Sequence, residues 1–132
     1  MRLSPAAEFA LRGVAVLANK FGQGPIPLKV ICSYRDLPKQ YLAKIFSGLS
    51  RVGLVSPVRG KHGGYMLARE PGSITVLEVI EAVEGRIELN YCQHTPPKCD
   101  QVNCPMRAVW TELQELVRSK LSSVTLADYV DS

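Results

Sequence analysis

The sequence predicts a mainly α-helical fold with a small β-hairpin, namely a winged helix-turn-helix followed by a long C-terminal helix. Two helical patterns separated by a short turn precede a glycine-rich basic hairpin, which is the order of a winged helix-turn-helix. A wide apolar stripe at helical spacing follows in the C-terminal third. We therefore expect a winged unit over residues 1–84 with its wing at 54–68, a cysteine-bearing loop over 85–104, and the long helix with a short terminal helix over 105–132.

The first helix is expected to begin at Pro5. Ser4 is a favourable N-cap, and proline suits the first helical position because its missing N–H would have no helical partner there. Apolar residues recur at helical spacing as far as Phe21. The helix is therefore expected to end before Gly22.

A second and a third helix follow, joined by a tight turn. The second is expected over residues 27–34 and contains Cys32, which we interpret as a small core residue because a single cysteine on a short helix more often packs than binds a metal. The third is expected over residues 38–52, with Gly53 as its stop. Its apolar stripe consists of Leu42, Ile45, Phe46, Leu49 and Val52.

The hairpin and the helix after it have clear local signals. Two short β-like runs over residues 54–68 flank a glycine-rich turn, and Pro57 indicates an edge strand because proline cannot donate to a ladder. Thr75 and Glu78 form the pattern of a capping box. They predict a helix that ends at Gly85.

The long helix is expected to begin at Pro105, and residues 125–130 predict a short terminal helix. An apolar stripe this wide can pack on its own domain and on a second copy at once, so we expect a homodimer formed through this helix. The alternative is a helix that packs only on its own domain. The stripe consists of Met106, Val109, Trp110, Leu113, Leu116, Val117 and Leu121.

Positive charge is concentrated in one stretch of the chain. The formal net charge is +4, yet Asp36 is the one acidic residue between positions 29 and 69, and five glutamates against Arg86 follow over residues 70–88. A stretch of one sign is typical of a face that binds a polyanion such as nucleic acid, whereas a merely solvated surface mixes both signs. The cations are Lys29, Arg35, Lys39, Lys44, Arg51, Arg59, Lys61 and Arg69.

Cys92, Cys99 and Cys104 stand close together in a polar, proline-bearing stretch. Such a loop has no packing reason to gather thiols, so we interpret these cysteines as metal ligands or redox groups. Three thiolates on one loop match a soft metal or an iron–sulfur cluster, and most such sites require a fourth ligand.

Several function classes are not expected. No apolar run reaches the ~18 residues that span a bilayer, and the N-terminus lacks the apolar region of a signal peptide, so we expect a cytoplasmic protein with no membrane partner. In a reducing compartment, clustered cysteines indicate metal binding or redox sensing rather than structural disulfides. No Cys-x-x-Cys pair, nucleophile–base pair or phosphate-binding glycine loop supports an enzyme, and a small thiol oxidoreductase is a remote alternative.

Several segments together resemble one family of bacterial transcription regulators. The opening MRLS, the stretch GLVS at residues 53–56, the wing VRGKHGGY at 58–65 and the three downstream cysteines resemble the IscR/NsrR family over nearly the whole chain. The resemblance implies a homodimeric winged-helix protein that binds double-stranded operator DNA and holds an iron–sulfur cluster on its cysteines. It also implies that loss or change of the cluster alters which promoters are bound.

The ligand pattern of the family is not intact in this chain. Members with a 2Fe–2S cluster take their fourth ligand from a histidine three residues after the last cysteine, and here that residue is Arg107, whose guanidinium cannot ordinarily coordinate iron. Glu8 matches the position where NsrR-like members use a carboxylate from the partner subunit, and His94 in the loop is the second choice. If neither residue binds, water, a small thiol or nothing would occupy the fourth position. We favour a 2Fe–2S over a 4Fe–4S cluster, because the helix–wing sequence is closer to the IscR branch.

The resemblance also indicates the residues that meet DNA. The start of the third helix is expected in the major groove, where glutamine can read adenine and lysine can bind phosphate or guanine. Arg59 at the base of the wing is expected in the minor groove. The full set is Arg2, Lys39, Gln40, Tyr41, Lys44, Arg51, Arg59, Gly60, Lys61, His62, Gly63 and Gly64.

The expected function is a DNA-binding transcriptional regulator, acting as a repressor, whose operator binding changes with the state of an iron–sulfur cluster. Its signal would be iron–sulfur or iron status, or oxidative or nitrosative stress. The alternative is a regulator that uses its cysteines for redox chemistry or zinc binding without a cluster. Zinc would accept the three cysteines together with Glu8 or His94.

Overall fold

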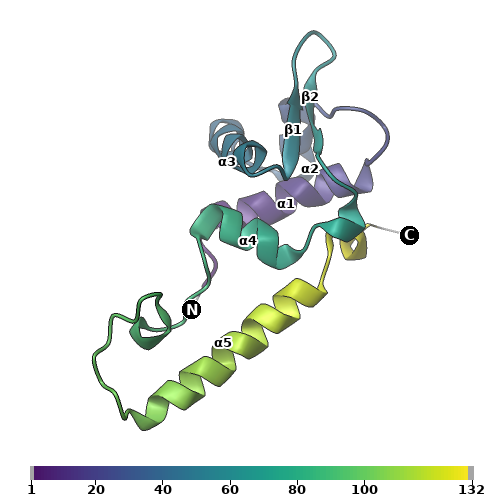
Figure 1. The fold of residues 1–132 in the computed structure, drawn as a ribbon. Coiled ribbons are helices and arrows are strands. Elements are labelled where there is room, and N and C mark those ends of the chain that lie inside the picture. Colours follow the sequence, from purple (N-terminus) through teal and green to yellow (C-terminus); the bar gives the residue numbers. More distant parts are fainter. Residues whose placement is uncertain (1, 131–132) are drawn as a thin grey trace.

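The computed structural model describes residues 2–130, so Met1 of the opening motif and residues 131–132 of the expected terminal segment lie outside the described part (Figure 1). The fold is mainly helical with one two-stranded antiparallel sheet, as the sequence predicts. Its elements in chain order are α1 (Pro5–Asn19), α2 (Leu28–Arg35), α3 (Lys39–Arg51), β1 (Val55–Val58), β2 (Gly64–Leu67), η1 (Pro71–Ser73), α4 (Val76–Glu84), η2 (Tyr91–Gln93), α5 (Pro105–Ser123) and η3 (Leu126–Tyr129), where η marks a 3₁₀ helix.

α1 begins where predicted and ends earlier. The Ser4 hydroxyl accepts a hydrogen bond from the Ala7 N–H at 3.1 Å, which caps the helix. Lys20 then leaves the helical conformation and Gly22 takes a positive φ of 87°. Phe21 therefore lies beyond the helix and is 41% exposed, and the prediction that the helical pattern extends to this residue is wrong.

α2 and α3 form the helix-turn-helix. Asp36 ends α2 in the left-handed conformation with a φ of 52°, and the Leu37 N–H donates to the Cys32 carbonyl at 3.0 Å. The Leu37 side chain is buried, so the turn is anchored in the core. On α3 the predicted stripe is buried except for Val52, which is 56% exposed because it is the C-cap and lies after the last helical turn.

The wing is the predicted hairpin, and it is joined to the segment before α2. β1 pairs with β2 in a register that places Val55 opposite Leu67. Tyr65 exchanges two backbone hydrogen bonds with Ile26, at 2.8 and 2.9 Å, so β2 has a partner on each side. Pro57 accordingly lies on the outer strand, where its missing N–H leaves no ladder bond unmade.

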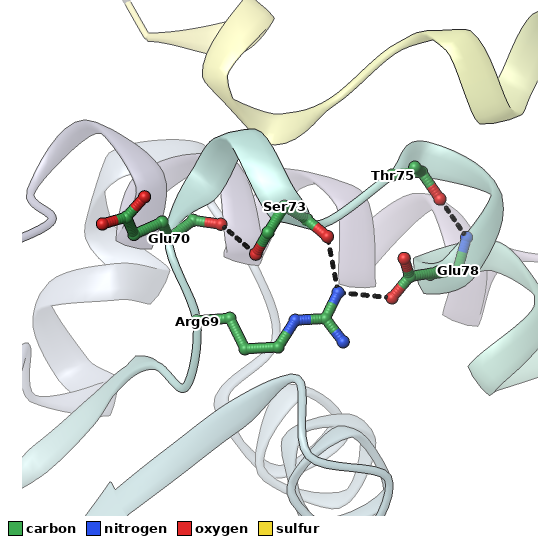
Figure 2. A network of polar contacts seen from close by, with 5 residues as sticks. All are labelled: Arg69, Glu70, Ser73, Thr75 and Glu78. Atoms are coloured by element: carbon green, nitrogen blue, oxygen red, sulfur yellow. Dashed lines mark hydrogen bonds and ion pairs between the residues drawn. The ribbon is translucent and has the colours of Figure 1, made fainter.

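Arg69 joins the end of the wing to the start of α4, as Figure 2 shows. Its guanidinium donates to the Ser73 carbonyl at 2.6 Å and to the Glu78 carboxylate at 2.7 Å. The Thr75 hydroxyl accepts from the Glu78 N–H at 3.1 Å, but the Glu78 carboxylate is the partner of Arg69, so the predicted capping box is formed only in this half. Arg69 therefore has a structural role, although it belongs to the basic stretch of the sequence that is expected to face a polyanion.

α5 begins at Pro105 as predicted and reaches away from the body of the molecule (Figure 1). It contacts α4 and η2, while the core lies among α1–α4, the sheet and η3. Gln114 is the one buried residue of α5, and most of the predicted apolar stripe is exposed. The exposed members are Met106, Val109, Leu113, Leu116 and Val117.

The structure places the wing and the cysteine-bearing segment at opposite ends of the molecule, with α1 and α4 between them (Figure 1). None of the helices over residues 2–130 combines the length and the apolar character needed to cross a membrane.

Candidate functional site

The polar face of α3 is directed away from the core. Lys39, Gln40 and Lys44 are exposed on its first turns. Tyr41 is 40% exposed, and its ring meets the Phe9 ring of α1 edge-on, with the centroids 5.5 Å apart. The start of α3 can therefore present cations and an amide to a ligand while Tyr41 ties it to α1.

The tip of the wing is also exposed and basic, over residues 59–62. The two glycines that follow are half-buried and have a structural role. A Cβ at Gly63 would lie 2.1 Å from the Val58 carbonyl oxygen, and one at Gly64 would lie 2.2 Å from the Ile26 carbonyl oxygen. Only glycine therefore allows the wing to close at its tip and to pair with the segment before α2.

Two predicted DNA contacts lie outside the first turns of α3 and the wing tip. Arg51 is exposed in the last turn of α3, where a cation is favourable at the negative end of the helix dipole. Arg2 lines a surface groove of about 540 Å³ together with Glu84 of α4 and with Val117 and Leu121 of α5. The structure therefore gathers most of the predicted residues on α3 and the wing and gives Arg2 a different setting.

The three clustered cysteines share one pocket. Cys92, Cys99 and Cys104 line a cavity of about 90 Å³ at the start of α5, and each side chain is half-buried and free of disulfide bonds. Apolar groups from the loop and from α5 complete its wall. The other lining residues are Asn90, Tyr91, Met106, Arg107 and Trp110.

The pocket brings the thiols together without converging them on one point. Among residues 2–130, no three His, Cys, Asp or Glu side chains are close enough to hold a metal ion. A single ion bound by all three thiols would therefore require the loop to tighten around it, since Zn–S bonds are about 2.3 Å long. The donor set itself, with three soft sulfur ligands against an apolar wall, fits an iron–sulfur cluster.

Arg107 belongs to the same pocket, and two loop carbonyls hold its guanidinium. One terminal nitrogen donates to the Gln101 carbonyl at 2.9 Å and lies 3.5 Å from the Cys99 carbonyl. The Nε–H of Arg107 is buried and has no hydrogen-bond partner among the described residues. Arg107 is therefore a hydrogen-bond donor beside the three cysteines, and its one buried N–H is unpaired among the described residues.

Neither candidate for the fourth ligand lines the cysteine pocket of its own chain. The Glu8 carboxylate pairs with Arg12 one turn along α1 at 3.4 Å, and its side chain is 46% exposed. His94 Nδ1 lies 2.8 Å from the Glu88 carboxylate. Glu8 is therefore open to a second molecule, whereas one nitrogen of His94 is already engaged.

Cys32 lies apart from this pocket, on α2. Its side chain is half-buried and packs against the core. Burial raises the pKa of the Cys32 thiol, and the Lys39 ammonium partly opposes that shift. A thiol that resists ionisation is a poor ligand and a slow nucleophile, which supports its interpretation as a core residue.

Three polar residues that connect the loop to α5 were not predicted. Gln93 donates to the Thr111 hydroxyl at 2.9 Å, and the same amide nitrogen lies 3.4 Å from the Cys92 sulfur. Gln114 is 5% exposed and accepts from the Leu89 N–H at 2.9 Å. The sequence does carry a signal for Gln114, since it interrupts the apolar stripe four residues after Trp110.

The whole sequence matches known regulators. A family model described as Rrf2, an iron-dependent transcriptional regulator, matches residues 3–132. The HTH-type transcriptional regulator IscR of Xenorhabdus nematophila is 36% identical over 130 residues, which cover 98% of this chain and 79% of that protein. The regulator of the same name from Klebsiella pneumoniae is 35% identical over 132 residues, which cover 100% of this chain and 81% of that protein.

Solved structures agree with the fold. CymR, described as the global cysteine regulator of B. subtilis, superposes with a TM-score of 0.85 at 33% identity and covers 99% of both chains. IscR of T. potens superposes with a TM-score of 0.81 at 32% identity, covering 97% of this chain and 85% of that one. These neighbours confirm the predicted fold class, and the relatives named above are transcriptional regulators rather than enzymes. The chain therefore belongs to the Rrf2 family of transcriptional regulators.

Proposed function

We propose that this chain acts as a homodimeric repressor in the cytoplasm, and that an iron–sulfur cluster held by Cys92, Cys99 and Cys104 sets its affinity for an operator. The observation that carries the proposal is that these three cysteines line one pocket in a chain of the Rrf2 family. When bound, the cluster would supply a group that changes charge and stability with oxidation or iron supply. We favour 2Fe–2S over 4Fe–4S.

The fourth ligand in this proposal is Glu8 of a second copy, with His94 of the same chain as the second choice. Glu8 is half-exposed on α1 and has a weak surface partner in Arg12, so a second molecule can displace that pair. A carboxylate is a harder ligand than histidine for a site rich in sulfur and exchanges readily, which suits a sensor.

DNA binding in this proposal uses the first turns of α3 in the major groove and the wing tip on the neighbouring backbone or minor groove. The exposed cations on both elements support it, because neutralised phosphates supply most of the affinity of such proteins for DNA. The second copy would pack on the exposed apolar face of α5, since a large apolar face left in water is unfavourable.

Contacts run from the cysteine pocket toward the wing. Gln114 of α5 holds the Leu89 N–H of the segment before the pocket. The Glu81 carboxylate of α4 accepts from Arg118 of α5, which fastens the two helices together. Arg69 then links the first turn of α4 to the end of the wing. We propose that a change at the pocket reaches the DNA-binding elements along this series, and a double-mutant cycle would measure the coupling.

A cysteine-based redox regulator without a cluster is the second candidate. The similarity to CymR, one of whose solved forms from Staphylococcus aureus is described as oxidised, favours it. All four cysteines of the described chain are free thiols, so oxidation remains open to them.

Anaerobic purification with an absorption spectrum and iron and sulfide counts separates the two candidates. A cluster gives visible colour together with matched iron and sulfide, and we expect substitution of all three pocket cysteines by alanine to remove both. Cys32→Ala is the matched control and should keep the colour, because Cys32 lies apart from the pocket. A colourless wild-type protein that still binds DNA would favour the redox candidate.

A further inference from the structure

We infer that Arg107 is a hydrogen-bond donor to sulfur in the cysteine pocket, where it stabilises the bound group without ligating it. The inference rests on the proposed function, since the bound group is the iron–sulfur cluster proposed above. It concerns a residue whose guanidinium cannot itself bind iron.

Two observations carry the inference. Arg107 lines the same cavity as the three cysteines. Its Nε–H is buried and unpaired among the described residues, although it belongs to a permanently charged group. Buried N–H groups without an acceptor are rare in native proteins, and this one belongs to a residue that lines the cavity, so we assign its acceptor to the group that the cavity holds.

The hydrogen bonds of the terminal guanidinium nitrogen restrict the direction in which the unpaired Nε–H can point. The terminal nitrogen is held by the Gln101 carbonyl at 2.9 Å, with the Cys99 carbonyl 3.5 Å away. Because the guanidinium is planar and rigid, fixing this nitrogen also restricts the direction of the Nε–H. Arg107 cannot swing out to solvent to satisfy the Nε–H without giving up the loop carbonyls.

The acceptor that fits this setting is an anionic sulfur. Thiolates and bridging sulfides are negatively charged when a cluster is bound, and the half-buried guanidinium of Arg107 offsets part of that charge. Hydrogen bonds to the sulfurs of a cluster are one of the means by which a protein tunes its reduction potential. Arg107 would therefore make the cluster easier to reduce and slower to lose, while its carbonyl contacts tie the position of residues 99–101 to the start of α5.

The test compares Arg107→Gln with Lys98→Gln in the anaerobically purified full chain. Both changes remove one positive charge from the cysteine region, but Lys98 is exposed and does not line the pocket. For Arg107→Gln we expect loss of iron to a chelator to be about 10-fold faster or more, the usual effect of removing a group that supports metal ligands. We also expect its midpoint potential to shift in the negative direction, and Lys98→Gln to match the wild type in both measurements.

Arg107→Lys keeps the charge and lacks the Nε–H, so its potential should shift in the same direction by less. This variant also carries the test if Arg107→Gln does not fold. Unchanged potentials in the Arg107 variants would overturn the inference, even if iron were lost faster, because loss of a hydrogen-bond donor to sulfur must shift the potential. A wild type with no cluster would overturn the proposed function and this inference together. A wild type that holds a cluster, with Arg107 variants whose midpoint potentials are unchanged, would overturn the inference alone.

Discussion

Gln114→Met should loosen the segment that leads into the cysteine pocket. Gln114 is 5% exposed in the middle of α5, and its side-chain oxygen accepts from the Leu89 N–H at 2.9 Å. Methionine has a similar length and no comparable acceptor, so the substitution preserves volume and leaves the Leu89 N–H unpaired. The Leu89 N–H is half-buried, so loss of this hydrogen bond should cost about 0.5–1.5 kcal/mol, which corresponds to a roughly 2- to 12-fold increase in local opening.

Hydrogen exchange of the Leu89 amide reports that opening directly, and urea unfolding at fixed protomer concentration reports the stability. The matched control is Gln101→Met, because the Gln101 side chain is exposed and only its backbone carbonyl is used by Arg107. We expect faster exchange at Leu89 and a lower urea midpoint in Gln114→Met, and no change in the control. If the Leu89 amide of Gln114→Met exchanged at the wild-type rate, the argument that the Gln114 side chain holds the segment around Leu89 against α5 would be refuted.

Three further predictions concern the wing, the DNA-binding face and Cys32. Gly64→Ala should lower the free energy of unfolding in urea by at least about 2 kcal/mol, since the added Cβ would lie 2.2 Å from a backbone oxygen and φ is +157°. Gly72→Ala should be neutral, because its added Cβ would lie 3.9 Å from the nearest atom. The slope of log affinity against log salt for duplex DNA is negative, and Lys44→Gln should reduce its magnitude by about 1 because one phosphate contact is lost. Lys120→Gln on α5 should leave the slope unaltered. Equal slopes in the two variants would contradict the placement of α3 in the DNA interface. Burial raises the pKa of the Cys32 thiol, so the folded state resists an ionisation that the unfolded chain undergoes near its ordinary value of 9.0. Stability should therefore fall as the pH rises above about 9, and Cys32→Ala should flatten that fall in urea titrations across this range.

Local signals in the sequence were sufficient for most of the fold. Ser4 followed by Pro5 predicted the start of α1, and the two β-like runs around the glycine-rich turn predicted the wing, because caps and turns depend on neighbouring residues. Phe21 and Val52 were misassigned because each follows an apolar pattern and lies just past a helix end. Periodicity alone does not show where such an end falls.

The candidate site was harder to predict, because its contacts join distant parts of the chain. The capping box at Thr75 was half wrong since Glu78 is taken by Arg69 from the end of the wing. The role of Arg107 as a pocket donor depends on two loop carbonyls that no local pattern reveals. The clustering of the three cysteines was visible in the sequence, whereas the residues that support them appear only in the structure.

The measurement that tests the central claim most directly is the affinity of cluster-loaded and cluster-free protein for one DNA duplex. The duplex would be selected from a random pool by the loaded protein and measured by fluorescence anisotropy at a single stated salt concentration, since affinities without it cannot be compared. We predict that loaded and cluster-free wild type differ in affinity, and that the variant with Cys92, Cys99 and Cys104 replaced by alanine has the cluster-free affinity under both treatments. Equal affinities for loaded and cluster-free wild type would contradict the claim that the cysteine pocket controls DNA binding.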